Sequence, residues 1–137
     1  MTKQTIRTSP LSDIRVKDCM HHGVMTCRED DSIRHVAAVM SNYRVHAVLV
    51  TNGNGARPVA IVSDLDVATA AATGAECTAL EAAATEPLTV SSDASAERAA
   101  QLMSEHGVSH LVVLDSAAAY PVGILSTLDI ASLLADD

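Results

Sequence analysis

The feature of this sequence that most constrains its fold is an internal repeat. When the chain is shifted by 63 residues, residues 20–67 align with residues 83–130 without a gap, and 14 of the 48 aligned pairs are identical. The identical pairs include Met40 with Met103 and Ser63 with Ser126. A duplication of this extent indicates two copies of one supersecondary unit, which bury a core together.

Each copy contains the same predicted elements in the same order. A short apolar strand ends in threonine, and a serine that can cap a helix follows it, Ser32 in the first copy and Ser95 in the second. Apolar residues then recur at helical spacing, and Gly107 ends the second of these helices. Next come a buried strand (45–50 or 108–114), a turn (52–55 or 115–119), a second strand (58–62 or 121–125) and a closing helix.

The order β-α-β-β-α, present twice, predicts an α+β fold. We place the two domains at residues 11–74 and 75–137. Residues 16–20 and 80–84 predict a short helical turn that leads each copy. The alanine-rich stretch 68–84 predicts a helix, a tight turn and another helix, so we do not expect a flexible linker between the copies.

Composition excludes several classes of protein. Of the 137 residues 48% are apolar, yet no run approaches the roughly 18 apolar residues of a membrane-spanning helix, so we expect neither disorder nor a membrane protein. The net charge is −8, and Tyr43 and Tyr120 are the only Phe, Trp or Tyr residues, which argues against nucleic-acid binding. Three cysteines and no apolar leader predict a cytoplasmic location.

The pattern Ser-x-x-Asp follows the second strand of each copy, as Ser63 with Asp66 and as Ser126 with Asp129. The free N–H groups of a helix start, together with the serine hydroxyl, can bind a phosphate. An aspartate three residues later lies on the same face and can accept both hydroxyls of a ribose. The alternative is that each serine only caps its helix and each aspartate is its capping partner.

Other residues could complete a nucleotide site. Adenine could lie between aliphatic side chains at the strand edges 24–26 and 87–89, and imidazoles before the central strands could approach a phosphate. Arg44 and Arg57 are further candidates for a positively charged partner of the phosphate, but the role we expect for each is on the solvated surface. The expected ligand-binding residues are Val24, Met25, Thr26, Val45, His46, Ser63, Asp66, Leu88, Thr89, Ser109, His110, Ser126 and Asp129.

The two copies predict unequal sites. Asp64 lies inside the first Ser-x-x-Asp motif, where its carboxylate would repel a phosphate, and Thr127 takes its place in the second. Conversely, eight of the nine lysine and arginine residues precede residue 60, which favours an anion in the first copy. Charge therefore favours one copy and the motif favours the other.

A second group, Cys19, His21, His22 and Cys27, contains residue types that bind zinc. Its spacing differs from the paired C-x-x-C pattern of zinc sites, so we assign no metal site or cofactor. A metal or redox sensor built on these four residues is kept as an alternative. No nucleophile with an orienting base and acid, P-loop or dinucleotide fingerprint is present in the sequence, so we do not expect an enzyme.

The motifs together resemble the CBS domain, a family whose members occur in tandem pairs called Bateman modules. The resemblance covers roughly residues 11–137 and implies two units packed through their sheets about a pseudo-twofold axis, with two clefts. It rests on Val16-Lys17-Asp18-Cys19-Met20, Thr26, the Met40 and Met103 helices, Val45-His46, Ser109-His110, Ser63-Asp64-Leu65-Asp66 and Ser126-Thr127-Leu128-Asp129.

The resemblance also implies a function. Such pairs commonly bind adenine nucleotides or related adenosyl ligands and act as energy or metabolite sensors without catalysis. We therefore expect AMP or ATP as ligand, a homodimer with its terminal helices facing each other, and a separate regulated protein. A ligand-free scaffold for dimerisation or partner binding is the other alternative.

Overall fold

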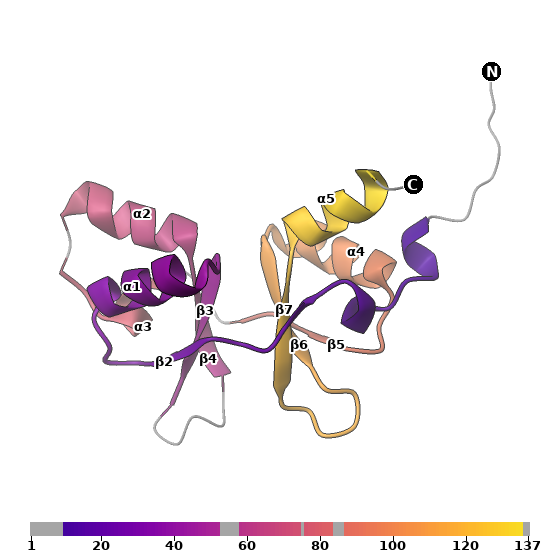
Figure 1. The fold of residues 1–137 in the computed structure, drawn as a ribbon, viewed down its shortest axis with the longest axis horizontal. Helices are drawn as coiled ribbons and strands as arrows, with labels where there is room; N and C mark the ends of the chain where they lie inside the picture. Colours follow the sequence, from indigo (N-terminus) through magenta and orange to yellow (C-terminus); the bar gives the residue numbers. More distant parts are fainter. Residues whose placement is uncertain (1–9, 53–57, 75, 84–86, 136–137) are drawn as a thin grey trace.

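The computed structural model describes residues 10–52, 58–74, 76–83 and 87–135. The first repeat contains β2 (Thr26–Arg28), α1 (Ile33–Tyr43), β3 (Ala47–Thr51), β4 (Pro58–Ser63) and α2 (Asp64–Thr73), followed by α3 (Ala79–Ala82). The second contains β5 (Thr89–Ser91), α4 (Ala96–His106), β6 (His110–Leu114), β7 (Pro121–Ser126) and α5 (Thr127–Ala135). The predicted β-α-β-β-α order is confirmed in both repeats (Figure 1).

The predicted helix starts are also confirmed. The side chain of Ser32 accepts a hydrogen bond from the backbone N–H of His35 at 3.1 Å, and Ser95 accepts one from Arg98 at 3.0 Å. Gly107 follows α4 with a left-handed backbone, φ 64°. Most of the turn expected at 52–55, together with Arg57, lies outside the described residues.

Two kinds of strand boundary differ from the prediction. The first strands begin at Thr26 and Thr89, where the sequence predicted that they would end. The central strands begin two residues late, because the N–H groups of Val45 and Val108 still donate to Met40 and Met103 of the preceding helices, each at 3.1 Å. Residues 45–46 and 108–109 are therefore connecting backbone, which leaves their side chains near the ends of the sheets.

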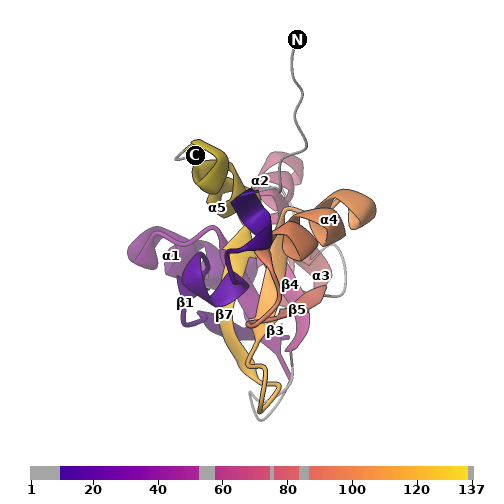
Figure 2. The ribbon, with the colours of Figure 1, turned by 90° about the vertical axis from the view of Figure 1, so that its right-hand side faces the viewer.

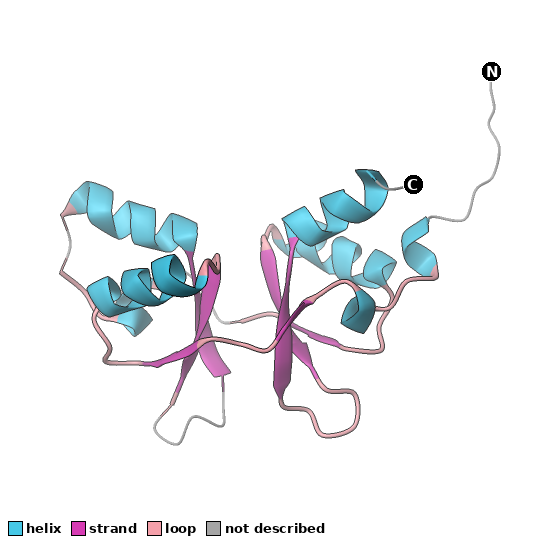
Figure 3. Cartoon of the chain, viewed as in Figure 1, coloured by secondary structure: helices cyan, strands magenta, loops and turns pink. Residues whose placement is uncertain are grey.

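The strands form two sheets that lie in the middle of the molecule, with the helices on their outer sides (Figure 3). In each repeat the first strand is parallel to the central strand, and the central strand is antiparallel to the next. A short strand, β1 (His21–His22), adds to the second sheet, where His21 pairs with Ile124 and His22 with Gly123.

The segments that lead the two repeats are exchanged. Each of the predicted turns forms, at Val16–Asp18 and Ala79–Ala82, but each packs against the other repeat. The N–H of Val16 donates to Ala94 of the second repeat at 2.8 Å, and that of Ala79 donates to Asp31 of the first at 2.7 Å. Figure 2 shows the amino-terminal segment beside α4 and α5.

The exchange ties the two repeats together. Val16 is fully buried in the core of the second repeat, and Ala79 is fully buried in the core of the first. The division of the chain near residue 74 stays a prediction, while the packing shows that neither core is complete without a segment from beyond its own repeat. Among the described residues, no helix is both long and apolar enough to cross a membrane.

The central strands are buried on both faces. In β3, Val48 and Val50 belong to the core of the first repeat, whereas Leu49, which alternates with them, is fully buried outside that core. Val112 of β6 occupies the equivalent position and is also fully buried. Leu49 and Val112 therefore fill the space between the two sheets, which carries the contact between the repeats.

Candidate ligand-binding cleft

A cleft of about 330 Å³ lies at the end of the contact between the repeats. The first repeat contributes the segment between β1 and β2 and the segment between α1 and β3. The second contributes the start of β6 and the end of β7. Six of the residues expected from the sequence line it, namely Val24, Met25, Val45, His46, His110 and Ser126.

The other seven expected residues do not line this cleft. They are Thr26, Ser63, Asp66, Leu88, Thr89, Ser109 and Asp129. Thr26 and Thr89 lie on edge strands and are exposed. The repeat relates residues 84–86, which the structure does not describe, to residues 21–23 of this cleft, so the equivalent second cleft is not described.

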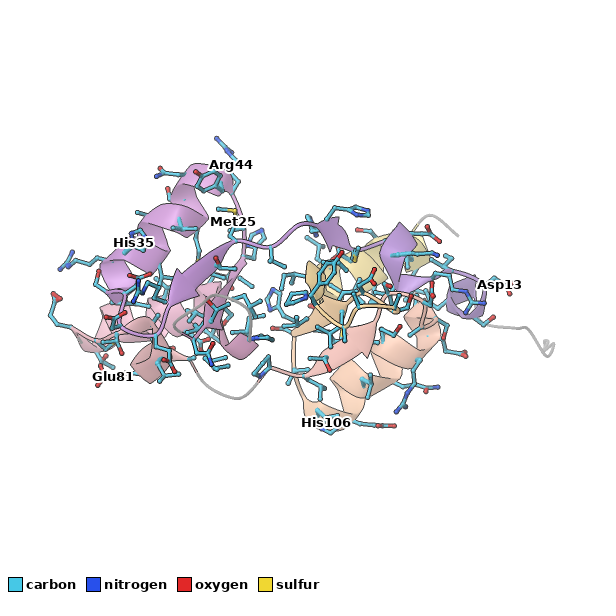
Figure 4. The ribbon with its side chains drawn as sticks, turned by 90° about the horizontal axis from the view of Figure 1, so that it is seen from below. Asp13, Met25, His35, Arg44, Glu81 and His106 are labelled. Carbon is cyan, nitrogen blue, oxygen red and sulfur yellow. The ribbon has the colours of Figure 1, made fainter. Side chains whose placement is uncertain are left out.

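Seven lining residues were not among the expected ones: His21, His22, Gly23, Tyr43, Arg44, Ala47 and Ile124. The pairing of β1 with β7 brings His21 and His22 here, and no local pattern in the sequence indicates that pairing. Tyr43 gives the cleft a phenol ring, which was not expected from the sequence. Arg44, expected on a solvated surface, lies at the rim of the cleft, near Met25 in Figure 4.

The two Ser-x-x-Asp motifs adopt the capping geometry. The N–H of Ser63 donates to Asp66 Oδ2 at 2.9 Å, and the N–H of Asp66 donates to Ser63 Oγ at 3.2 Å. Ser126 and Asp129 repeat this pair of bonds at 2.8 and 3.2 Å. The capping alternative therefore describes the motifs in this structure, and several donors expected for a phosphate are already satisfied within the protein.

Asp129 has a second partner that Asp66 lacks among the described residues. The ring of His21 places Nδ1 3.3 Å from the Asp129 carboxylate. The Asp129 side chain is only 11% exposed, whereas that of His21 is 72% exposed. The contact therefore joins an exposed imidazole to a nearly buried carboxylate.

Further imidazoles line the cleft. Nδ1 of His46 donates to Asp64 Oδ2 at 3.0 Å, so the carboxylate that would repel a phosphate is paired with an imidazole. His110 is half-buried, and Nδ1 lies 3.0 Å from Ser109 Oγ. Burial lowers the pKa of His110, and His46 lowers it further, while Asp64 acts in the opposite direction. The neutral form of His110 is favoured in the folded protein.

The four residues of the zinc alternative are divided between the two repeats. Cys27 is buried in the core of the first repeat, and Cys19 packs against the core of the second. Burial raises the pKa of both thiols, that of Cys27 to about 11, which disfavours the thiolate that binds zinc. The described residues contain no cluster of three or more potential metal ligands. This arrangement does not support a shared site at Cys19, His21, His22 and Cys27.

Solved structures resemble this fold closely. The CBS domain protein PAE2072 from Pyrobaculum aerophilum, complexed with AMP, is 29% identical and covers 90% of this chain and 97% of its own, with a TM-score of 0.79. The CBS domain pair of protein MJ0100, in complex with 5′-methylthioadenosine and S-adenosyl-L-methionine, is 24% identical and covers 89% and 96%, with a TM-score of 0.78.

Hypoxic Response Protein I, with two coordinated zinc ions, is 25% identical and covers 86% of this chain and 97% of its own, with a TM-score of 0.68. No curated protein sequence matches the chain significantly. The family model of the CBS domain matches twice, at residues 16–73 and 80–136, which together make up most of the chain. The chain therefore belongs to the CBS domain family, as a tandem pair of CBS domains.

Proposed function

We propose that this protein is a non-catalytic regulatory module that binds an adenine nucleotide, AMP or ATP, between its two CBS domains. CBS domain pairs are regulatory modules rather than catalysts. The observation that carries the proposal is the cleft between the repeats, which combines apolar walls with a few converging polar groups. The AMP complex of PAE2072, which aligns over 90% of this chain, supports AMP as the first ligand to test.

The residues of the cleft suit the parts of such a ligand. Val24, Met25 and Ile124 provide aliphatic surface for the base, and Tyr43 adds an aromatic ring. The hydroxyl of Ser126 and the imidazoles of the cleft face the polar part of the ligand. We assign the ribose to Asp129, where its hydroxyls take the place of the His21 ring while the bond from the Ser126 N–H is kept.

The remaining expected residues belong to the second cleft in this proposal. By the repeat, Leu88, Thr89 and Ser109 would contact the base and phosphate there, and Ser63 with Asp66 would contact the ribose. The two clefts would then differ in occupancy, because Asp64 stands at only one of the two helix starts.

Ligand binding would be coupled to the association of the protein. A ligand in the cleft contacts both repeats, so it stabilises their packing and can bias a surface elsewhere. The surface we propose for homodimerisation is formed by α2 and α5, which lie on the same side of the molecule (Figure 1). Leu65 is 71% exposed on α2 and Leu128 is 66% exposed on α5.

The tyrosines offer a direct test. Tyr43 lines the cleft, and Tyr120 precedes β7 outside it, so a Tyr120→Phe protein reports on Tyr43 alone by its intrinsic fluorescence. We expect titration with AMP to change this fluorescence with saturation and to raise the melting temperature. At a hundred times the dissociation constant, the added stability is about 2.7 kcal/mol. Tyr43→Phe should remove the fluorescence change and keep the thermal shift.

The alternatives give different results in the same experiment. A ligand-free scaffold predicts no response to AMP, ATP, adenosine or S-adenosylmethionine in either signal. A metal sensor predicts a thermal shift with Zn²⁺ alone. Either result would contradict the proposed function, and simultaneous replacement of Asp66 and Asp129 by Ala must weaken nucleotide binding if the proposal is correct.

A further inference from the structure

Helix α1 ends in an unusual way compared with α4. Its last turn closes on Arg44, which has φ 55° and ψ 46°, and α4 closes on Gly107 with φ 64° and ψ 35°. Both ends make the same bond, from Val45 to Met40 and from Val108 to Met103, each at 3.1 Å. Glycine adopts this left-handed backbone without steric cost, whereas other residues do so uncommonly.

The fold therefore requires the left-handed conformation at residue 44 but does not require arginine there. The second repeat shows that glycine closes the same helix end, and nothing lies within 4 Å of the position a Cβ atom would take at Gly107. An arginine thus costs conformational energy at this place in the first repeat. Residues held in unfavourable backbone conformations are concentrated at functional sites, where their side chains have a task.

The side chain of Arg44 is available for such a task. Within the described part of the chain, it makes no ion pair or side-chain hydrogen bond, whereas Arg28 pairs with Asp30 and Arg34 pairs with Glu76. Arg44 is exposed and lines the cleft, and its side chain extends outward from the end of α1 in Figure 4. Its guanidinium is free to turn toward a ligand bound there.

The charges around the cleft make Arg44 decisive for an anionic ligand. It is the only lysine or arginine among the lining residues that the structure describes. The nearby carboxylates of Asp64 and Asp129 are paired with His46 and His21, and burial lowers the pKa of His110, which favours its neutral form. A phosphate in the cleft therefore meets one permanent positive charge, on a planar group that can pair with two phosphate oxygens.

Resting on the proposed function, we propose that Arg44 makes this cleft select phosphorylated adenosine over uncharged adenosine. The strain at the end of α1 is retained because the side chain at that position binds the phosphate. Gly107 has no side chain at the equivalent place in the second repeat, so the two clefts differ in their affinity for a phosphate. Arg44 thereby determines specificity, while the apolar walls of the cleft bind the base in either ligand.

The test compares AMP with adenosine by isothermal titration calorimetry on the full chain. Arg44→Gly, which copies the second repeat, should weaken AMP binding about tenfold, because one charged hydrogen-bonding group is lost. Adenosine binding should stay within about twofold, and the melting temperature without ligand should not fall. Arg44→Lys should keep part of the preference for AMP. Arg34→Gln removes a positive charge from outside the cleft and should leave both affinities unchanged.

The inference and the proposed function fail in different ways. If the wild-type protein binds neither AMP nor adenosine, the proposed function is wrong and this inference falls with it. If the wild-type protein binds AMP but Arg44→Gly weakens AMP and adenosine equally, or changes neither, the role of Arg44 is wrong while the proposed function stands. A melting temperature lowered by Arg44→Gly would show that arginine supports the helix end, which contradicts the strain argument.

Discussion

The two repeats share their fold but differ in their surroundings. The sheet of the second repeat is extended by β1, whose His22 pairs with Gly123 of β7. The residue of the first repeat that corresponds to Gly123 is Ala60, which is buried in β4 with its Cβ in place. Within the described residues, glycine thus stands where β1 packs closely against β7, and alanine stands at the corresponding place in β4.

The cleft also combines residues that the two repeats share with residues that differ between them. Serine and aspartate are identical in the two capping motifs, and both motifs make the same backbone bonds. The residues that distinguish the repeats are at the helix ends, where Arg44 stands against Gly107 and Asp64 against Thr127. A duplicated unit can therefore keep its stability in the shared residues and acquire unequal sites through the differing ones.

The largest loss of stability is expected for substitutions at the contact between the two repeats. Leu49→Ala removes a fully buried side chain from the space between the sheets and should lower the free energy of unfolding by about 2–5 kcal/mol. Val112→Ala, at the equivalent position, removes less apolar volume and should cost less. Urea denaturation should show one cooperative transition for both variants. Two separate transitions would mean that the repeats do not fold as one unit.

The variant with the next largest expected effect tests the packing of β1 against β7. Gly123→Ala would bring a Cβ atom against the backbone oxygen of His21 and to 2.7 Å from Met20 Sδ. We expect a loss of about 1–3 kcal/mol in stability, because β1 must shift away from β7. Urea denaturation measures the loss. The contact of His21 with Asp129 should weaken as well, which would appear as a changed chemical shift of the His21 ring in NMR spectra.

Ala60→Gly is the matched change in the first repeat. It should cost only about 0.5–1 kcal/mol, since it adds backbone freedom in a strand and removes one methyl group. Equal losses for Gly123→Ala and Ala60→Gly would contradict the view that the close approach of β1 requires glycine at residue 123.

Much of this fold could be predicted from the sequence, because the repeat allowed each element to be recognised twice. Ser32 and Ser95 cap their helices as predicted, since a cap depends only on nearby residues. The exchange of the leading segments could not be predicted in this way. The pattern around Val16 predicts a helical turn, but which of two similar cores it enters depends on contacts far apart in the chain.

The candidate site shows the same limit. Val45, His46 and Ser126 were expected because they stand at fixed positions beside predicted strands. Tyr43 was missed, and Arg44 was considered for a phosphate but expected on the solvated surface, although its alignment with Gly107 was a usable signal. To use this signal, one has to know that both residues end a helix with a positive φ angle. The spacing of apolar residues in the sequence does not reveal this backbone angle.

Removing the helix cap from either Ser-x-x-Asp motif should have a similar effect on stability, but the two changes should differ in their effect on AMP binding. Ser63→Ala and Ser126→Ala each remove a side-chain cap and should cost about 1 kcal/mol by urea denaturation. Only Ser126 lines the described cleft, so only Ser126→Ala should weaken the tighter AMP site in calorimetry. If Ser63→Ala weakens that site as much, the clefts are equivalent and the asymmetry argued here is wrong.

The smallest expected effect is a dependence of stability on pH through His110. Burial lowers its pKa in the folded protein below the ordinary value of 6.5, so the unfolded chain takes up this proton first as the pH falls. The folded protein therefore keeps its full stability with respect to this group above pH 6.5, and it loses free energy of unfolding progressively as the pH falls below that value. The His110→Gln variant should lose less stability than the wild type between pH 7.5 and pH 5.5, as measured by urea denaturation at each pH.

His106→Gln provides the control, because it replaces an exposed histidine at the end of α4 in the same repeat (Figure 4). This variant should keep the wild-type difference in stability between the two pH values. AMP should oppose the acid loss if its phosphate lies near the imidazoles, since protonation then strengthens binding while it weakens the free fold. If AMP leaves the pH dependence unchanged at saturation, the phosphate does not lie near His110, and Arg44 remains its only proposed partner.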